Sequence, residues 1–399
     1  MKKITIIAKK LNMEGGGSDF SIHLLSQMLN KNGIKVLVIP VCTNRNSLPS
    51  NRNYQVSQPE ERLAKTRIGE FKQVYEIMKT HQYESDLFHI FTPAYFAIAG
   101  FFRRNHKSPP VVGRLNTYNL FCTNHSKMTG ECHKNCNSIS KMSHDSVGVG
   151  KKIAKTPLYL IQNHLEPYYA NEIDKYFAIS PSVKKIYCDT GLDPEKIEVI
   201  PNFYDPDFTR ERSDSDGSKF RNTGNSDLEI LYVGRLAETK GTEMLIRAVA
   251  ELPSTQLKIV GDGPLMNDLV SLSKELSIDS QVEFEGQVPY KELSKYYIES
   301  DIFVHPAQWP EPFGRTVLES LQHGTPAVVS DMGAPSWIVG EAGKSFNSDS
   351  PRQLISILSD LQDSPEKISR MSANCDNTIE RFSPNTILEK IISEYNSLF

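Results

Sequence analysis

The stretch Phe303–Ser330, FVHPAQWPEPFGRTVLESLQHGTPAVVS, determines how the second half of this 399-residue chain folds. Its pattern predicts a short buried strand, a proline-rich loop, a helix that begins at Phe313 or Gly314, and a second strand over Ala327–Val329. Gly324 follows the helix, and glycine is the commonest residue just past a helix end. Strand, helix and strand in this order predict an α/β fold with a parallel sheet.

Two glutamates flank the start of the predicted helix. Glu311 lies in the loop and Glu319 lies within the helix, eight residues later. At about 100° per residue, eight positions bring the second carboxylate to within roughly 80° of the first. Such pairs also occur by chance in charged helices, but the prolines on either side of Glu311 are not what a solvated helix face requires.

Between the two glutamates, the backbone N–H groups of the first helical turn point outward, and a glycine there lets a ligand approach the main chain closely. The residues of this turn are Phe313, Gly314, Arg315 and Thr316. We interpret the arrangement as an anion site with a carboxylate on each flank. A phosphate joined to hydroxyl-rich groups on both sides, such as a nucleotide-sugar, would suit it.

The alternation of strand and helix recurs along the whole chain, with a polar stretch at Glu211–Asp227 that we interpret as a linker or flexible loop. The predicted strands are Lys3–Ala8, Ile34–Val41, Asp86–Phe91, Val111–Leu115, Asp174–Ser180, 196–208, Glu229–Val233, Gln256–Val260, Val282–Gly286 and Ile302–His305. This order predicts two parallel, doubly wound sheets. Right-handed crossovers place the strand-to-helix turns of each domain at the carboxyl edge of its sheet. We expect the two edges to face each other across a central cleft.

Several of these turns contain residues suited to binding phosphate. One turn of the second domain joins Gly234 and Arg235 to Lys240, and its two cations could neutralise a diphosphate. In the first domain, Gly16 and Gly17 belong to a glycine-rich turn that either cradles phosphate or only makes a tight connection.

Four segments resemble, in order, the donor-binding domain of the family 4 glycosyltransferases, which are retaining enzymes of the GT-B fold with an E-x(7)-E signature. They are VGRLAETKG, IVGDGP, FEGQVPYKELSKYY and EPFGRTVLESLQHGTPAVVS. Two first-half segments, GGGSDFSIHLLSQMLNKNGIKVLVI and AISPSVKKIYCDTGLDPEKIEVIPN, look like the start and the end of the acceptor domain of that family. The resemblance implies an acceptor domain at 1–205, a donor domain at 206–384 and a C-terminal helix, about 385–399, that returns to the first domain.

The resemblance also implies roles for individual residues. Arg235 and Lys240 would hold the diphosphate, Glu319 the ribose hydroxyls and Glu311 the transferred sugar, while Val288 lies in the loop that meets the base. The donor site would be completed by Gly16, Gly17, Gly234, Gly263, Phe313, Gly314, Arg315 and Thr316. In this family the acceptor attacks from the face that the diphosphate leaves, and a departing phosphate oxygen takes its proton. We expect no divalent-metal requirement and no other cofactor.

The chain departs from the family pattern at two places. Asn116 stands where the family often has a histidine, and an amide can bond a sugar hydroxyl but cannot transfer a proton. Asn116 is therefore a candidate catalytic-site residue without an assured proton-transfer role. The turn MGAPSWI, 332–338, differs from the Gly-Gly-x-x-Glu-like turn of the family, so the sugar cannot be predicted from it.

Three cysteines and two histidines, Cys122, His125, Cys132, His133 and Cys136, lie within 15 residues. Thiolates and imidazoles suit zinc, so a structural zinc site is one hypothesis. The Cys-x(3)-Cys spacing is not the usual Cys-x(2)-Cys, so a plain or redox-active loop stays open as the other.

Two acid pairs, Asp205-x-Asp207 and Asp214-x-Asp216, resemble the metal motif of the other glycosyltransferase fold. Both pairs lie in or beside the polar linker. We interpret them as solvated loop acids.

Charge and hydropathy indicate where the protein acts. Residues 1–200 hold 27 Lys and Arg against 17 Asp and Glu, giving +10, whereas the remainder holds 18 against 31, giving −13. The basic first domain is expected to meet an anionic partner, and because no nucleic-acid module is recognisable we favour membrane lipid or a lipid-phosphate acceptor. The helix Ala94–Lys107 is either a buried helix with a basic end or a membrane-facing patch. No run is long enough to span a bilayer, and Met1-Lys2-Lys3 leads into a strand rather than a signal peptide. We therefore expect a protein that is either cytoplasmic or bound peripherally to the cytosolic face of the membrane.

Together these features predict a retaining glycosyltransferase that moves a hexose-type sugar from a nucleotide diphosphate to a glycan or lipid-linked acceptor in cell-surface glycan or glycolipid synthesis. Two alternatives are a nucleotide-sugar epimerase or hydrolase of the same fold, and a nucleotide-sugar binding protein that has lost catalysis.

Overall fold

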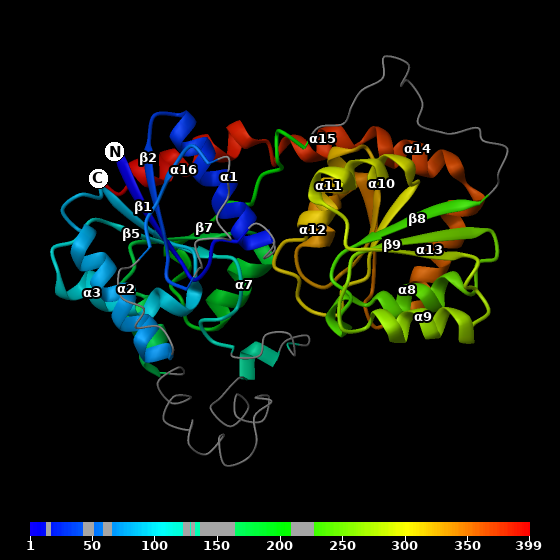
Figure 1. The fold of residues 1–399 in the computed structure, drawn as a ribbon, viewed down its shortest axis with the longest axis horizontal. Helices are drawn as coiled ribbons and strands as arrows, with labels where there is room; N and C mark the ends of the chain where they lie inside the picture. Colours follow the sequence, from blue (N-terminus) through cyan, green and yellow to red (C-terminus); the bar gives the residue numbers. More distant parts are fainter. Residues whose placement is uncertain are drawn as a thin grey trace, which may run out of the picture. The chain divides into compact units, whose positions relative to one another are not determined.

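The computed structural model describes residues 1–12, 17–42, 52–58, 66–122, 128, 132–135, 164–208 and 227–399 (Figure 1). The chain forms two compact units. Unit 1 consists of Met1–Asn202 with Pro384–Phe399, and unit 2 of Phe203–Ser383. From the sequence, the boundary between the two units was predicted at 205/206, and the return of the chain to the first unit was predicted at about 385.

Unit 1 is built on a parallel sheet whose described strands follow the order β3-β2-β1-β4-β5-β6-β7. The strands are β1 (Lys3–Ala8), β2 (Lys35–Pro40), β3 (Gln55–Val56), β4 (Leu87–Ile90), β5 (Val111–Leu115), β6 (Lys175–Ala178) and β7 (Ile197–Val199). Its longer helices are α1 (Gly17–Lys31), α2 (Arg67–His81), α3 (Phe96–Asn105), α7 (Pro181–Asp189) and α16 (Pro384–Asn396). The strand order reverses between β1 and β4, which is the topological switch point of a doubly wound sheet.

Unit 2 repeats this plan with the strand order β10-β9-β8-β11-β12-β13, all parallel. The strands are β8 (Leu228–Val233), β9 (Thr255–Val260), β10 (Val282–Gly286), β11 (Ile302–His305), β12 (Ala327–Ser330) and β13 (Gly343–Phe346). The helices are α8 (Thr242–Val249), α9 (Met266–Glu275), α10 (Leu293–Glu299), α11 (Arg315–Gln322), α12 (Pro335–Val339), α13 (Pro351–Asp363), α14 (Pro365–Ala373) and α15 (Cys375–Glu380), and they lie on both sides of the sheet (Figure 1). Here the order reverses between β8 and β11.

The C-terminal helix α16 packs in unit 1, as the sequence predicted. Its Tyr395 hydroxyl lies 2.6 Å from Nδ1 of His89 on β4, and both side chains are fully buried. At the helix surface, Glu394 forms an ion pair with Lys175 of β6. A buried hydrogen bond and an apolar helix face therefore attach the end of the chain to the first sheet.

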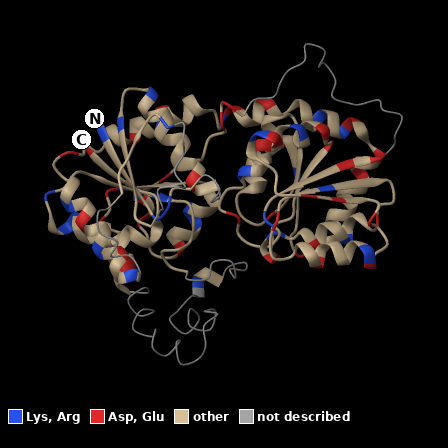
Figure 2. Cartoon of the chain, in the orientation of Figure 1, with Lys and Arg blue, Asp and Glu red and all other residues tan. Residues whose placement is uncertain are grey.

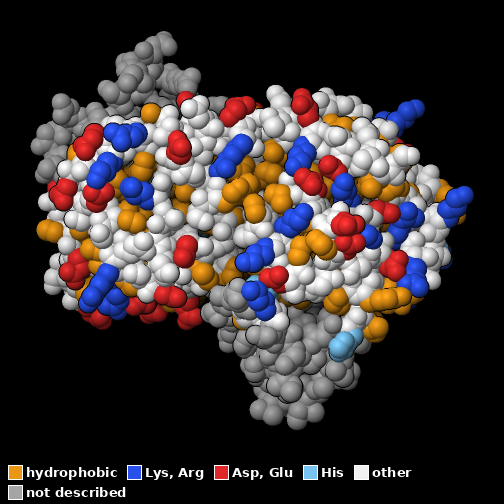
Figure 3. Space-filling view, turned by 180° about the vertical axis from the view of Figure 1, so that it is seen from behind, with side chains coloured by type: hydrophobic (Ala, Val, Ile, Leu, Met, Phe, Trp, Pro, Cys, Tyr) orange, Lys and Arg blue, Asp and Glu red, His pale blue; other side chains and the backbone are white. Residues whose placement is uncertain are grey.

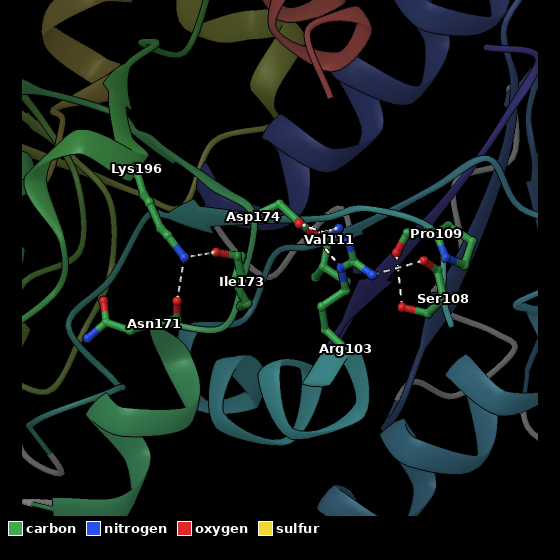
Figure 4. A network of polar contacts seen from close by, with 8 residues as sticks. All are labelled: Arg103, Ser108, Pro109, Val111, Asn171, Ile173, Asp174 and Lys196. Atoms are coloured by element: carbon green, nitrogen blue, oxygen red, sulfur yellow. Dashed lines mark hydrogen bonds and ion pairs between the residues drawn. The ribbon is translucent and has the colours of Figure 1, made fainter. Parts of the chain in front are cut away.

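The basic end of α3 is used inside unit 1 (Figure 4). Arg103 donates to both carboxylate oxygens of Asp174, at 2.9 and 3.1 Å, and the same carboxylate accepts from the Val111 backbone at 2.8 Å. The next residue, Arg104, pairs with Glu172 at 2.7 Å. These two arginines thus serve the packing of α3, which favours the first of the two hypotheses for this helix.

Replacing Asp174 by alanine should lower the free energy of unfolding by about 2 kcal/mol, because a partly buried bidentate pair and a backbone bond are lost together. Urea unfolding of the variant would measure the change. Glu198→Ala is the matched control in the same unit, because its pair with Lys390 is exposed and should contribute less than about 0.5 kcal/mol. Equal effects of the two substitutions would contradict a structural role for the Arg103 pair.

Candidate functional site

The loops that follow β8 and β11 meet at the switch point of unit 2. The Gln308 backbone donates to the Thr239 carbonyl at 2.8 Å. Gly241 has φ +69°, and a Cβ there would lie 1.9 Å from the Pro306 carbonyl oxygen, so only glycine allows the loops this close. In open α/β sheets, ligands bind at the carboxyl ends of the strands beside such a reversal.

A cluster of polar side chains joins these two loops. Glu311 Oε2 accepts from Lys240 Nζ at 2.5 Å and from the indole nitrogen of Trp309 at 2.9 Å. His305 Nε2, at the end of β11, lies 3.8 Å from the same oxygen. The Lys240 ammonium also lies 5.4 Å from the centre of the Trp309 ring. Two predicted site residues, Lys240 and Glu311, are therefore in direct contact.

The backbone of Glu311 is held by the turn after β12. Its N–H donates to the Met332 carbonyl at 3.2 Å, and its carbonyl accepts from Ala334 at 2.9 Å. Gly333 has φ +91°, and a Cβ there would lie 2.2 Å from the Glu311 carbonyl oxygen. Met332, Gly333 and Ala334, at the start of the MGAPSWI turn whose role the sequence left open, thus position the main chain of Glu311.

The contacts of Glu311 stabilise the ionised form of its carboxyl group. Burial alone would raise the pKa of this carboxyl, but the Lys240 ammonium holds the pKa well below its usual range. Burial lowers the pKa of His305, so its ring is neutral at pH 7. The cluster therefore consists of one ammonium, one carboxylate and two neutral rings.

Glu319 lies on α11 in a different environment. Its side chain is 5 % exposed, and Oε2 accepts from the Tyr297 hydroxyl at 3.0 Å. Burial raises the pKa of Glu319 to about 7, against the opposing charge of Arg315. Glu311 and Glu319 are therefore two carboxylates whose environments shift their pKa values in opposite directions.

One sequence interpretation is wrong: Asp205 is not a solvated loop acid. It is buried, and its backbone carbonyl accepts from Gln322 of α11 at 2.7 Å. Burial raises the pKa of the Asp205 carboxyl, with Arg315 acting in the opposite direction. The residue lies beside α11 because Phe208, three positions later, packs against His323 at the end of this helix at 4.6 Å, and it also stacks on Tyr290 at 4.4 Å. The other pair, Asp214 and Asp216, lies outside the described residues.

Helix α11 begins at Arg315, one residue after Gly314, where the sequence predicted the start of the helix. Gly314 is the N-cap, with φ +99°, and it has no side chain to bond the first-turn N–H groups. Arg315 and Thr316 are half-buried in this first turn. Phe313 points into the core, where it packs edge-on against Phe382 at 6.0 Å, so only its main chain is available to a ligand.

The remaining predicted residues of unit 2 lie at the same edge of the sheet. A Cβ on Gly263, after β9, would lie 2.3 Å from the Leu236 carbonyl oxygen, so the turns after β8 and β9 pack backbone on backbone. Gly234 and Arg235 directly follow β8, and Arg235 is exposed. Val288 follows β10, two strands away from β8, and is half-buried.

Asn116 follows β5 at the corresponding edge of unit 1. Its Nδ2 donates to Ser18 Oγ on α1 at 2.9 Å and to the Phe91 carbonyl at 3.0 Å. Among the described residues, none bonds its buried Oδ1. Gly17 begins α1 next to this contact, whereas Gly16 lies outside the described residues.

The described part of the cysteine-rich segment shows His133 engaged elsewhere: its Nε2 lies 3.1 Å from an Asp189 carboxylate oxygen. Cys122 is buried and Cys132 is half-buried, whereas His125 and Cys136 lie outside the described residues. Within the described ranges, no three His, Cys, Asp or Glu side chains are grouped as a metal would need. The zinc hypothesis stays a prediction.

Sequence reasoning missed four residues of this site: Trp309, His305, Tyr297 and Tyr290. A weak signal existed for Trp309, which stands two positions before Glu311. The tyrosines gave none, because aromatic residues at helical spacing are typical of an ordinary core.

Two family models match the chain. "Glycosyltransferase Family 4" matches residues 15–208 and "Glycosyl transferases group 1" matches residues 216–377. The first model spans most of unit 1 and the second spans most of unit 2, including every predicted site residue of that unit.

Curated relatives match over part of their length. An uncharacterized glycosyltransferase of Methanocaldococcus jannaschii is 38% identical over 163 residues, which is 39% of this chain and 42% of the relative. The lipopolysaccharide core biosynthesis glycosyltransferase LpsE of Rhizobium meliloti is 30% identical over 178 residues, 44% of this chain and 50% of the relative. The chain thus spans about half or less of the length of these relatives.

Among solved structures, Anabaena HepE in complex with UDP superposes with a TM-score of 0.73 at 20% identity, and the match covers 100% of both chains. At this identity the likeness concerns the fold, and it agrees with the two Rossmann-like units seen here. The same protein has also been solved with UDP-glucose.

Proposed function

Because the chain belongs to the family 4 glycosyltransferases, we propose that it transfers a sugar from a nucleotide-diphosphate sugar, bound by unit 2, to a glycan or lipid-linked acceptor. The observation that carries this proposal is the switch point of unit 2, where an uncapped helix N-terminus lies between two carboxylates of opposite pKa shift. A donor of this class has a diphosphate between two hydroxyl-rich groups. The presence of UDP-glucose in HepE, a protein of the same fold, supports a nucleotide-sugar donor.

We assign the diphosphate to the N-terminus of α11 and to the cations of the β8 turn. Lys240 keeps donors for a phosphate oxygen, because an ammonium has three and one is used by Glu311. Arg235, in the same turn after β8, is exposed. A helix N-terminus with its partial positive charge favours the same anion.

Glu319 is assigned to the ribose hydroxyls and Glu311 to the transferred sugar. Sugar hydroxyls are donors, and an ionised carboxylate accepts from them strongly. Val288 lies at the edge where the base is expected. We further propose a retaining transfer, in which the departing phosphate oxygen takes the acceptor proton, since the Glu311 carboxylate is already paired with Lys240.

The acceptor is assigned to unit 1, where Asn116 offers a buried carbonyl oxygen without a described partner. The basic charge of residues 1–200 favours an anionic acceptor or membrane surface, and we propose a cytoplasmic protein peripheral to the membrane. Lys and Arg recur on the helices of unit 1 (Figure 2), although one face of the molecule intersperses both charges with hydrophobic side chains (Figure 3). Within the described ranges, no helix has the length and hydropathy needed to cross a bilayer.

The proposal is tested by thermal shift with UDP, GDP, ADP, dTDP and CMP, followed by donor turnover. One nucleoside diphosphate at about 100 times its dissociation constant should add roughly 2.7 kcal/mol of stability. The stabilisation should disappear in Glu319→Gln and persist in Glu251→Gln, an exposed acid of the same unit. No stabilisation by any nucleotide would contradict a donor site. Turnover of the sugar donor without an acceptor would favour the hydrolase or epimerase alternative.

A further inference from the structure

Among the residues that the structure describes, every polar contact of the Glu311 carboxylate falls on one of its two oxygens. Lys240 and Trp309 both donate to Oε2, at 2.5 and 2.9 Å, and His305 approaches that same oxygen at 3.8 Å. In the part of the chain that the structure describes, nothing bonds Oε1. The Glu311 side chain is 13% exposed. Its unbonded oxygen, Oε1, is the one that solvent reaches.

A carboxylate held in this way has one occupied oxygen and one oxygen presented to a ligand. A freely rotating carboxylate offers two equivalent oxygens and adapts to hydroxyls in several positions. When one oxygen is held by two donors, the direction of the other oxygen is set by the protein. The ligand hydroxyl must then come to that oxygen.

We propose that Trp309 is a positioning residue that fixes Glu311 so that Oε1 alone accepts a hydrogen bond from one hydroxyl of the donor sugar. This inference rests on the proposed function of the site. It makes Trp309, which the sequence analysis did not single out, a determinant of which sugar hydroxyl is recognised.

The indole is better suited to this task than its two neighbours. Its ring is rigid, and its single N–H donor is used on Glu311. Lys240 is a flexible chain whose ammonium also lies over the Trp309 ring, so the ring orients the cation as well. His305 is neutral and beyond hydrogen-bond distance, so it limits the space around the carboxylate without holding it.

The test is Trp309→Phe, which keeps an aromatic ring and removes the N–H. The donor sugar is compared with a deoxy analogue on the same nucleotide that lacks the recognised hydroxyl. In the unchanged protein, the analogue should have a kcat/KM about 10- to 100-fold lower than that of the full donor. In Trp309→Phe this ratio should fall to about 3-fold or less, while the dissociation constant of the nucleoside diphosphate stays within about 2-fold.

Two variants make the result specific. Trp337→Phe is the matched control: the chain has two tryptophans, and Trp337 packs against Phe382 at 5.3 Å. It should keep the full discrimination ratio. Trp309→His restores a ring N–H and should recover part of the ratio, which a purely structural role of the indole would not explain.

A second measurement uses the unchanged protein. With the indole nitrogens labelled with ¹⁵N, two N–H signals are expected, and Trp337→Phe assigns them. The Trp309 signal should shift further with the nucleotide-sugar than with the nucleoside diphosphate, because Lys240, which lies over the ring, meets the diphosphate in both cases. If nucleotide binds but the ratio in Trp309→Phe equals that of the unchanged protein, or the Trp309 signal ignores the sugar, the positioning role is overturned. If no nucleotide binds at all, the proposed function fails first.

Discussion

Glu311→Gln is expected to lower kcat/KM for sugar transfer about 100-fold while nucleoside diphosphate affinity stays within about 2-fold or becomes tighter. Lys240 and Trp309 are both donors, so the amide oxygen must take the Oε2 place. The amide NH₂ then occupies the ligand-facing place. A hydrogen-bond acceptor for a sugar hydroxyl thus becomes a donor, in a site that cannot rotate to compensate. Loss of the negative charge also frees Lys240 for the diphosphate.

Initial rates with saturating acceptor, together with calorimetric titration of the nucleoside diphosphate, separate the two effects. Glu283→Gln is the control, because this glutamate of β10 has a side chain that is 64% exposed. A parallel loss of nucleotide affinity in Glu311→Gln would mean that Glu311 contacts the nucleotide instead. Full activity in the variant would remove Glu311 from the site.

Much of the fold was predictable because turn residues mark its boundaries. The strands β1, β5, β10 and β11 begin and end where the sequence predicted them. β1 and β11 are rich in apolar and β-branched residues, β5 adds a glycine and an arginine, and β10 alternates apolar residues with glutamates. The alternation of these strands with helices left a doubly wound parallel sheet as the consistent topology. The two-residue strand β3 was missed, because an edge strand this short has no periodicity to detect.

The candidate site was predictable in its members but not in its contacts. The Glu311 and Glu319 pattern is local, so spacing and the resemblance could find it. The contact between Lys240 and Glu311 joins residues 71 positions apart, and it exists because β8 and β11 are neighbours at the switch point. Asp205 was misjudged for the same reason, since its polar sequence context does not reveal that it packs beside α11. That the carboxyl edges of the two sheets face each other across a cleft stays a prediction.

The second large effect concerns stability and pH at Glu319. Burial raises its pKa from 4.5 to about 7, so the folded protein favours the protonated carboxyl. The stability associated with that shift is fully present below pH 4.5 and is lost as the pH rises through 7. At 1.36 kcal/mol per pKa unit, the loss amounts to at most about 3 kcal/mol. A glutamine at this position has no charge to bury and can still accept from the Tyr297 hydroxyl.

Glu319→Gln should therefore be about as stable as the unchanged protein at pH 5 and more stable by about 1–3 kcal/mol at pH 8. Urea unfolding of both proteins at the two pH values measures this difference. The raised pKa of Asp205 contributes in both proteins, and its effect largely cancels in the comparison. A stability difference that does not change with pH would mean that Glu319 is ionised throughout. The expected result instead means that the chain keeps a buried carboxyl at a cost in stability, and donor hydroxyls that bond its ionised form would offset that cost on binding.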